Sequence, residues 1–243
     1  MDENYRLFFI SDAHFGSESE EKEEEKLKRF QQFLDSNLKE NDYLFIVGDL
    51  FDFWFEYRYL IPKDCFRVLN ILYNLAKKGI KIFYISGNHD YWENGFFKKE
   101  MGVEFYHDSL TIDLMSKRFY LHHGDGFIKK DKRYLLLRSI LRNKVNIWLY
   151  KLIHPDLSAF LAKYFSNLSR TNSTEKYYSS FEEYFRFARE RFEEGVDFVI
   201  MGHTHIPIIK EFEDRFFINI GDWMENFTYG IYDGFQFRLE KWR

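Results

Sequence analysis

Apolar residues recur along this chain with two spacings, and the spacings predict alternating strands and helices. Short runs of strand-forming apolar residues cover Tyr5 to Ile10, Tyr43 to Val47 and Ile80 to Ile85. Between these runs, apolar positions return every three or four residues over Glu18 to Glu40 and Asp64 to Lys78, as in amphipathic helices. The resulting β-α-β-α-β order predicts an α/β fold with parallel strands.

The pattern changes after the third predicted strand. From Lys129 to about Arg191 the chain has an almost wholly helical pattern, and a strand is predicted at Asp197 to Met201. The last forty residues are typical of strands and turns. Because no repeat or low-complexity linker divides the chain, we expect residues 1–243 to form a single domain with a helical lid insertion at about 129–191. Three short strands are predicted before that insertion, at 103–107, 110–114 and 118–122.

The composition excludes several classes of protein. The chain is 45% hydrophobic and 30% charged, as globular proteins are, and aromatic residues make up 21% of it, enough for a large core. With only 13 Gly, 3 Pro and one Cys, it is neither collagen-like nor a disulfide scaffold. The single Cys65, the lack of a secretory signal and the lack of an 18-residue apolar run predict a cytoplasmic protein.

Charge is unevenly distributed along the sequence. The whole chain carries a formal charge of −4, but residues 129–170 hold ten basic residues against two acidic ones, a balance of +8. This segment is also rich in Leu, Ile, Trp and Phe. Two interpretations stay open: helices with a solvated basic face, or a lid that meets an amphiphilic anion or an anionic membrane surface. The net charge gives no support for nucleic acid as a partner.

Five short polar motifs stand where predicted strands end, and they contain five of the eight His residues. Ligand sites in open α/β sheets collect at the carboxyl ends of strands, so these motifs could meet in space. Each motif alone is typical of a loop or turn, but five at successive strand ends indicate one shared site. The motifs are Asp12-Ala13-His14, Gly48-Asp49-Leu50-Phe51-Asp52, Gly87-Asn88-His89-Asp90, His123-Gly124-Asp125 and Gly202-His203-Thr204-His205.

The residue types in these motifs predict a metal centre. Carboxylate, imidazole and amide donors suit Mn, Zn or Fe better than a site selective for soft thiolates. Glycine precedes Asp49, Asn88 and His203, where it permits sharp turns close to a metal or phosphate. Asp90 and Asp125 are expected to orient neighbouring imidazole rings.

The order D-x-H, GDxxD, GNHD, HGD, GHxH resembles the calcineurin-like metallophosphoesterases over residues 5 to about 222. This resemblance implies a four-layer α-β-β-α sandwich and two divalent metal ions. Carried over motif by motif, it implies seven ligands: Asp12, His14 and His205 for one ion, Asn88, His123 and His203 for the second, and Asp49 bridging both.

A narrower resemblance is to the UDP-2,3-diacylglucosamine hydrolases of the lipid A pathway. The chain length, the stretch that begins at Gly48, and the helical insertion after His123-Gly124-Asp125 carry it. It implies a pyrophosphohydrolase at the cytoplasmic face of the inner membrane, with Mn²⁺ as the metal and Fe or Zn as the alternatives. It also implies that the insertion holds acyl chains, and that Asp131 binds substrate together with Asn88 and His89. The stretch 169–176 lies roughly where that family places polar substrate contacts.

One position departs from that narrower family. Its best-known members have Arg after the Asn of GNRD, whereas this chain has His89, as in the general family. The alternative is therefore a calcineurin-like phosphodiesterase or phosphatase that acts on nucleotides or another phosphoester. A scaffold that has lost catalysis is disfavoured, because all seven expected ligands are present.

The expected mechanism is attack of a metal-activated water on phosphorus. Three residues are expected to act in catalysis: His203 on the phosphoryl charge, and His89, oriented by Asp90, which protonates or hydrogen-bonds the leaving oxygen. Outside this set, Asp52 is expected behind the ligands, and Asp222 near the site or in a turn. His107, His122 and His154 are expected to be structural or ordinary.

Overall fold

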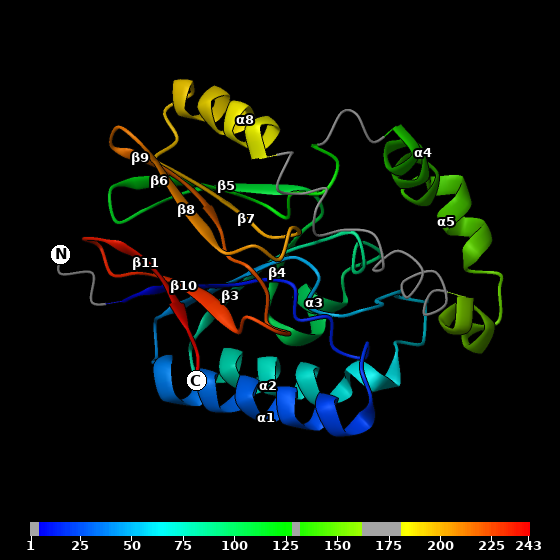
Figure 1. Cartoon of the computed structure of the whole chain (residues 1–243). Helices are drawn as coiled ribbons and strands as arrows, with labels where there is room; N and C mark the ends of the chain where they lie inside the picture. Colours follow the sequence, from blue (N-terminus) through cyan, green and yellow to red (C-terminus); the bar gives the residue numbers. More distant parts are fainter. Residues whose placement is uncertain (1–4, 128–131, 162–180) are drawn as a thin grey trace.

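The computed structural model describes residues 5–127, 132–161 and 181–243, and in this part of the chain two β-sheets face each other (Figure 1). The first sheet contains β1 (Leu7–Ile10), β2 (Tyr43–Val47), β3 (Lys81–Ile85), β4 (Glu104–Tyr106), β10 (Thr228–Tyr232) and β11 (Phe237–Lys241). Its strand order is β11-β10-β1-β2-β3-β4. Strands β1 to β4 are parallel, and β10 and β11 extend the sheet in antiparallel pairing.

The second sheet contains β5 (Ser109–Leu114), β6 (Lys117–His122), β7 (Phe198–Met201), β8 (Ile208–Phe212) and β9 (Arg215–Asn219). Its order is β5-β6-β7-β9-β8, with a parallel centre of β6, β7 and β9 and antiparallel strands at both edges. The predicted strands at 103–107, 110–114 and 118–122 correspond to β4, β5 and β6.

Helices cover the outer face of each sheet (Figure 1). The helices α1 (Glu20–Asn37), α2 (Phe66–Lys77) and α3 (Phe96–Met101) cover the first sheet, and a short 3₁₀ turn, Lys63–Cys65, leads into α2. The helix α8 (Phe181–Glu193) covers the second. The predicted α-β-β-α sandwich is therefore confirmed.

The alternation of side chains along β1 explains why this strand is apolar throughout. Phe8 and Ile10 pack toward the helices of the first sheet, while Leu7 and Phe9 pack toward the second sheet. All four are buried, as expected for a strand covered on both faces. The sandwich therefore has a central core between the sheets and a further core beneath each helical layer.

Between β6 and β7 the described chain forms helices of two kinds, which differ in whether they pack against the sandwich. The first kind comprises α4 (Lys132–Leu141), α5 (Lys144–Tyr150) and a helical stretch at 155–161. The second is α8, whose Tyr184, Ala188 and Phe192 pack against β7 and β9. Because α8 belongs to the sandwich by its packing, the lid that we propose below is limited to the helices that precede it. Among the described helices, none combines the length and apolar content needed to cross a membrane.

Candidate metal centre

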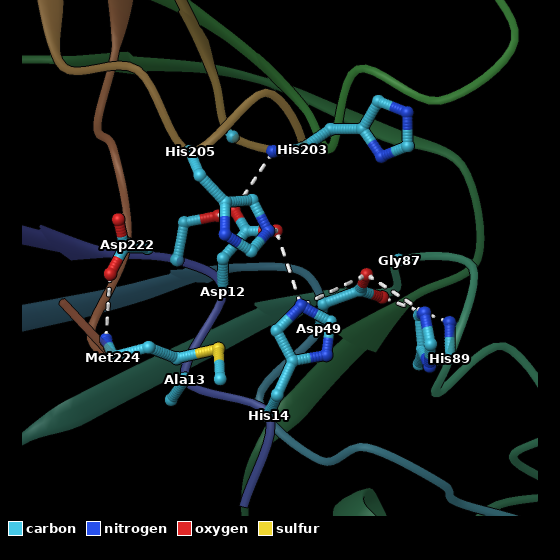
Figure 2. Close-up of polar contacts among 12 residues, drawn as sticks. Asp12, Ala13, His14, Asp49, Gly87, His89, His203, His205, Asp222 and Met224 are labelled. Carbon is cyan, nitrogen blue, oxygen red and sulfur yellow. Dashed lines mark hydrogen bonds and ion pairs between the residues drawn. The ribbon is translucent and has the colours of Figure 1, made fainter. Parts of the chain in front are cut away.

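The loops that carry the expected ligands follow five parallel strands of the two sheets. In each loop the ligand lies within about five residues of the strand's carboxyl end, where the two sheets bring the loops together (Figure 2). Asp12 and His14 follow β1, Asp49 follows β2, Asn88 follows β3, His123 follows β6, and His203 and His205 follow β7.

The backbone of these loops adopts an unusual conformation. In the described parts of the chain, ten residues other than glycine have positive φ angles, and half of them are expected ligands. A left-handed backbone costs free energy in residues with a side chain, so surrounding contacts must hold it, as is typical of functional sites. These five ligands are Asp12 (52°), His14 (43°), Asp49 (52°), His203 (69°) and His205 (59°).

Two glycines in the motifs lie where there is no room for a Cβ atom. A Cβ at Gly87 would overlap the side chain of Asp49, and a Cβ at Gly202 would overlap Ser11 and Asp12. Neither glycine has a positive φ angle, so a lack of room explains them better than the turn expected from the sequence.

The side chains form two ligand groups. One group comprises Asp12, His14 and His205, whose His205 Nε2 lies 3.2 Å and His14 Nε2 3.7 Å from Asp12 Oδ1. The other comprises Asp49, His123 and His203. The potential ligand atoms within each group all lie within 4.8 Å of one another.

Asp49 belongs to the second group and also approaches the first. Its Oδ2 is 3.2 Å from His123 Nε2 in one group and 3.7 Å from His14 Nε2 in the other. Figure 2 shows this carboxylate joined by dashed lines to both His14 and His89. A carboxylate in this position is suited to bridge two cations.

Several ligand atoms in this centre are buried and make no hydrogen bond to a described residue. Among the described residues, Asp12 Oδ1, Asn88 Oδ1 and His123 Nε2 make no hydrogen bond within the protein. Buried polar atoms are seldom left unpaired, so such a cluster of oxygen and nitrogen atoms fits a divalent cation. The Nδ1–H of His123 donates to the carbonyl oxygen of Val47 at 2.9 Å, which directs the Nε2 lone pair into the site.

Comparisons with known proteins agree with this geometry. The sequence profile described as calcineurin-like phosphoesterase matches residues 5–207. The chain belongs to the calcineurin-like phosphoesterase family. It is therefore a hydrolase of phosphoesters, in a family that uses divalent metals.

Curated relatives within this family are similar over most of their length. The chain is 31% identical to the UDP-2,3-diacylglucosamine hydrolase of Porphyromonas gingivalis, with 97% of each chain covered. It is 29% identical to the enzyme of that name from Haemophilus influenzae, with 91% of this chain and 92% of that one covered. A solved archaeal phosphodiesterase is 14% identical over 97% of this chain and 98% of that one, with a TM-score of 0.47.

Electrostatics in this phosphoesterase centre give three of the ligands the protonation state that a cation needs. Burial alone raises the pKa of Asp49, but the neighbouring rings of His123 and His89 outweigh it and hold that pKa far below its usual value. Burial lowers the pKa of His14 and of His203 to about 4. The carboxylate is therefore ionised and these two rings are neutral near pH 7, as metal ligands must be. For His123 and His205, burial lowers the pKa, but the carboxylates of Asp49 and Asp12 outweigh burial and raise it above the usual value.

Asp90 holds two ligand loops together. Its carboxylate accepts the backbone N–H groups of Leu50 at 2.8 Å and Gly87 at 2.6 Å, together with the hydroxyl of Tyr84. The expectation that Asp90 orients the His89 ring is wrong, because its oxygen atoms are engaged by these loops. Burial and the nearby Asp49 raise the pKa of Asp90 to about 6.

His89 is oriented by Asp52. The Nδ1–H of His89 donates to the Asp52 carbonyl oxygen at 2.8 Å, and Asp52 Oδ1 lies 3.8 Å from His14 Nδ1. Asp52 thus lies behind the ligands, where it was expected. The Nε2 of His89 is 4.0 Å from Asp49 Oδ2, so His89 also forms a possible ligand group with His14 and Asp49.

Asp125 connects the centre to α4. Its Oδ2 accepts Nε–H of Arg138 at 2.6 Å, Nη2–H of Arg142 at 2.9 Å and the hydroxyl of Tyr134 at 3.3 Å. Burial raises the pKa of Asp125, but Arg142 and its neighbours outweigh burial and hold it far below its usual value. Asp125 was expected to orient an imidazole ring, but in the structure its carboxylate binds side chains of α4.

The other expected residues occupy varied positions. The Oδ1 of Asp222 accepts backbone N–H groups of the 224–226 turn, including Met224 at 2.8 Å (Figure 2). His122 Nδ1 accepts the Gly124 N–H at 2.8 Å, which supports its structural assignment. His154 is exposed, and the expected substrate residue Asp131 and the stretch 169–176 lie outside the described residues.

Proposed function

We propose that this protein cleaves UDP-2,3-diacylglucosamine to UMP and 2,3-diacylglucosamine 1-phosphate, as a metal-dependent pyrophosphohydrolase. The observation that carries the proposal is the pair of ligand groups that Asp49 connects, in a chain similar over nearly its whole length to hydrolases of that name. The proposal places the reaction in lipid A biosynthesis.

In this proposal the centre holds two divalent ions, with Mn²⁺ preferred over Fe or Zn. Asp12, His14 and His205 would hold one, Asn88, His123 and His203 would hold the other, and Asp49 would contact both. When bound, such ions supply a hydroxide nucleophile near neutral pH and neutralise phosphoryl charge. Support comes from the three buried ligand atoms that lack a hydrogen bond within the described structure.

His89 is proposed to donate a proton or a hydrogen bond from Nε2 to the leaving oxygen, with hydrogen on both ring nitrogens. Its Nδ1–H is held by the Asp52 carbonyl, so Nε2 is the ring atom that faces Asp49 and the centre. The side chain is 16% exposed, and a substrate oxygen can therefore reach it. His203 is proposed to stabilise charge on the phosphoryl group, and Asp90 to act only by positioning the loops.

The acyl chains are proposed to lie on α4, α5 and the 155–161 stretch, which we call the lid helices. Nine large apolar side chains of these helices, and Leu152 in the turn that follows α5, are exposed by 41% or more, an unusual concentration for a protein surface. They are Leu136, Leu137, Ile140, Leu141, Val145, Trp148, Leu149, Leu152, Leu157 and Phe160.

The lid helices also provide positive charge, and their link to Asp125 brings them next to the centre. We propose that this amphiphilic surface contacts the substrate and the cytoplasmic face of the inner membrane, with the protein otherwise cytoplasmic and formed by one domain. Asp131, at the start of this region, stays a proposed substrate contact.

A second candidate function is hydrolysis of a different phosphoester, such as a nucleotide or a small phosphodiester. His89 favours it, because the general family has histidine at this position. The large exposed apolar surface of the lid helices favours the lipid substrate, since a small diester would not need it.

The test is UMP release from UDP-2,3-diacylglucosamine in detergent micelles, with Mn²⁺ or with EDTA, beside bis(p-nitrophenyl) phosphate as a small diester. We expect UMP only with metal, and turnover should fall strongly in His89→Gln but not in His154→Gln, which changes an exposed histidine. Cleavage of the small diester without UMP release would support the second function. No metal-dependent hydrolysis of either compound would contradict both.

A further inference from the structure

Lys26 is a buried lysine of α1, next to the ligand loop that follows β1. Its side chain is 2% exposed and lies on the inner face of α1, next to Leu27 and in line with Phe30 and Phe33. Lysine is rarely buried, because removal of an ammonium group from water costs several kcal/mol unless new contacts compensate. The ammonium group of Lys26 must therefore have strong partners.

These partners belong to the loop that follows β1. The Nζ of Lys26 donates to the carbonyl oxygens of Ala13 at 2.9 Å and His14 at 3.2 Å. It also donates to Glu23 Oε1 at 3.0 Å, and it lies 5.0 Å from the ring centroid of Phe15. Three acceptors thus lie within 3.2 Å of the ammonium nitrogen, two of them backbone groups of one ligand loop, and Glu18 Oε2 lies 3.7 Å away.

That loop needs external support. Asp12 and His14 both have left-handed φ angles, which are unfavourable for residues with a side chain. Their N–H groups bond to the carbonyl oxygens of Gly48 and Asp49, on the side of the neighbouring ligand loop. Lys26 binds the carbonyl groups of the same short segment from the helix side.

We propose that Lys26 is a positioning residue, whose ammonium group fixes the 12–14 loop so that Asp12 and His14 point at the first cation. The proposal rests on the metal centre of the proposed function. A simple role in neutralising Glu23 does not explain the geometry, because a surface lysine could pair with that carboxylate without being buried or binding Ala13 and His14.

The test replaces Lys26 by methionine, which keeps a long apolar stem and removes the charged donor. Lys28→Met is the matched control, because Lys28 lies exposed on the same helix. Mn²⁺ binding to the metal-free full-length chain is measured by calorimetry. The Mn²⁺ dependence of diester hydrolysis and the melting temperature of the metal-free protein are measured in parallel.

We expect Lys26→Met to weaken one Mn²⁺ site by about 10–100-fold, the range for residues that orient a metal ligand. Saturating Mn²⁺ should restore kcat, so that the loss appears as a higher Mn²⁺ requirement, and Lys28→Met should match the wild type. Electrostatics alone predicts the opposite sign, because loss of a positive charge near the site would tighten cation binding. Weaker Mn²⁺ binding by Lys26→Met would therefore indicate that the 12–14 loop is no longer held in position.

A lower melting temperature with unchanged Mn²⁺ affinity would overturn the proposal and leave Lys26 a purely structural role. If Lys26→Met does not fold, Lys26→Gln, which keeps one donor group, takes its place in the same titration. A weaker Mn²⁺ affinity than the wild type would support the proposal, and an equal affinity would overturn it. Failure of the wild-type chain itself to bind Mn²⁺ would instead contradict the proposed function, so the two failures are distinguishable.

Discussion

The helices of the sandwich and the lid helices are both rich in apolar residues, but the burial of those residues is opposite. In α1 and α8, the apolar face is covered, and Phe30, Phe33 and Tyr184 are fully buried. In α4 and α5, Leu136 and Trp148 are 63% and 60% exposed. The sequence therefore predicts helices in both regions, but it does not say what covers their apolar side chains.

The two regions are also held by different forces. The sandwich is stabilised by apolar cores between and outside its sheets. The described contacts of the lid helices include charged and polar ones: Arg138 and Arg142 with Asp125, and the Trp92 Nε1–H with the Leu141 carbonyl oxygen at 3.1 Å. In the proposed function, this difference leaves the exposed apolar side chains of the lid helices available to a ligand.

The largest expected effect on stability separates the two kinds of helix. Phe33→Ala should destabilise the protein by about 3–5 kcal/mol, because it opens a cavity in a packed core. Trp148→Ala should change stability by no more than about 0.5 kcal/mol, because this larger side chain is mostly exposed. Urea unfolding of both variants measures the contrast, and equal losses would mean that the lid helices form part of the core.

A smaller effect is expected from the link between the lid helices and the centre. The double variant Arg138→Gln, Arg142→Gln leaves Asp125 without its charged partners and should loosen α4. We expect turnover of the lipid substrate to fall about tenfold, equivalent to about 1.4 kcal/mol, while small-diester turnover changes little. Lys144→Gln, at an exposed position of α5, serves as the control.

Kinetics on the two substrates and hydrogen exchange over residues 132–161 check that prediction. Faster exchange there, with a selective loss of lipid turnover, would support the role of the lid helices. A parallel loss on both substrates would show that the arginines act on the metal centre through Asp125 instead.

Much of the fold and of the ligand set could be predicted from the sequence, because both depend on local signals. The ligand motifs follow strands that are apolar on both faces, and the strand ends collect the polar residues. The helix α3 was missed because its six residues are too few for a clear helical period. The helix Glu18 to Glu40 was predicted, but α1 is shorter, Glu20–Asn37.

The contacts between distant segments could not be predicted in this way. Lys26 has the sequence context of one more charged residue in an acidic helix start, and only the folded structure shows its burial. The pairing of Asp125 with Arg138 and Arg142 could have been suspected from the basic segment, but not assigned. Asn226, which donates to the carbonyl oxygen of His205 at 3.0 Å, had no motif at all.

The central claim is that Asp49 joins two ligand groups into one dinuclear centre. The most direct measurement is the number of Mn²⁺ ions bound per chain, determined on purified protein after metal removal and reloading. We expect two ions per chain for the wild type, one for His205→Ala and one for His123→Ala. A single ion in the wild type, or loss of both ions in each variant with the fold intact, would contradict two ligand groups that each hold a metal.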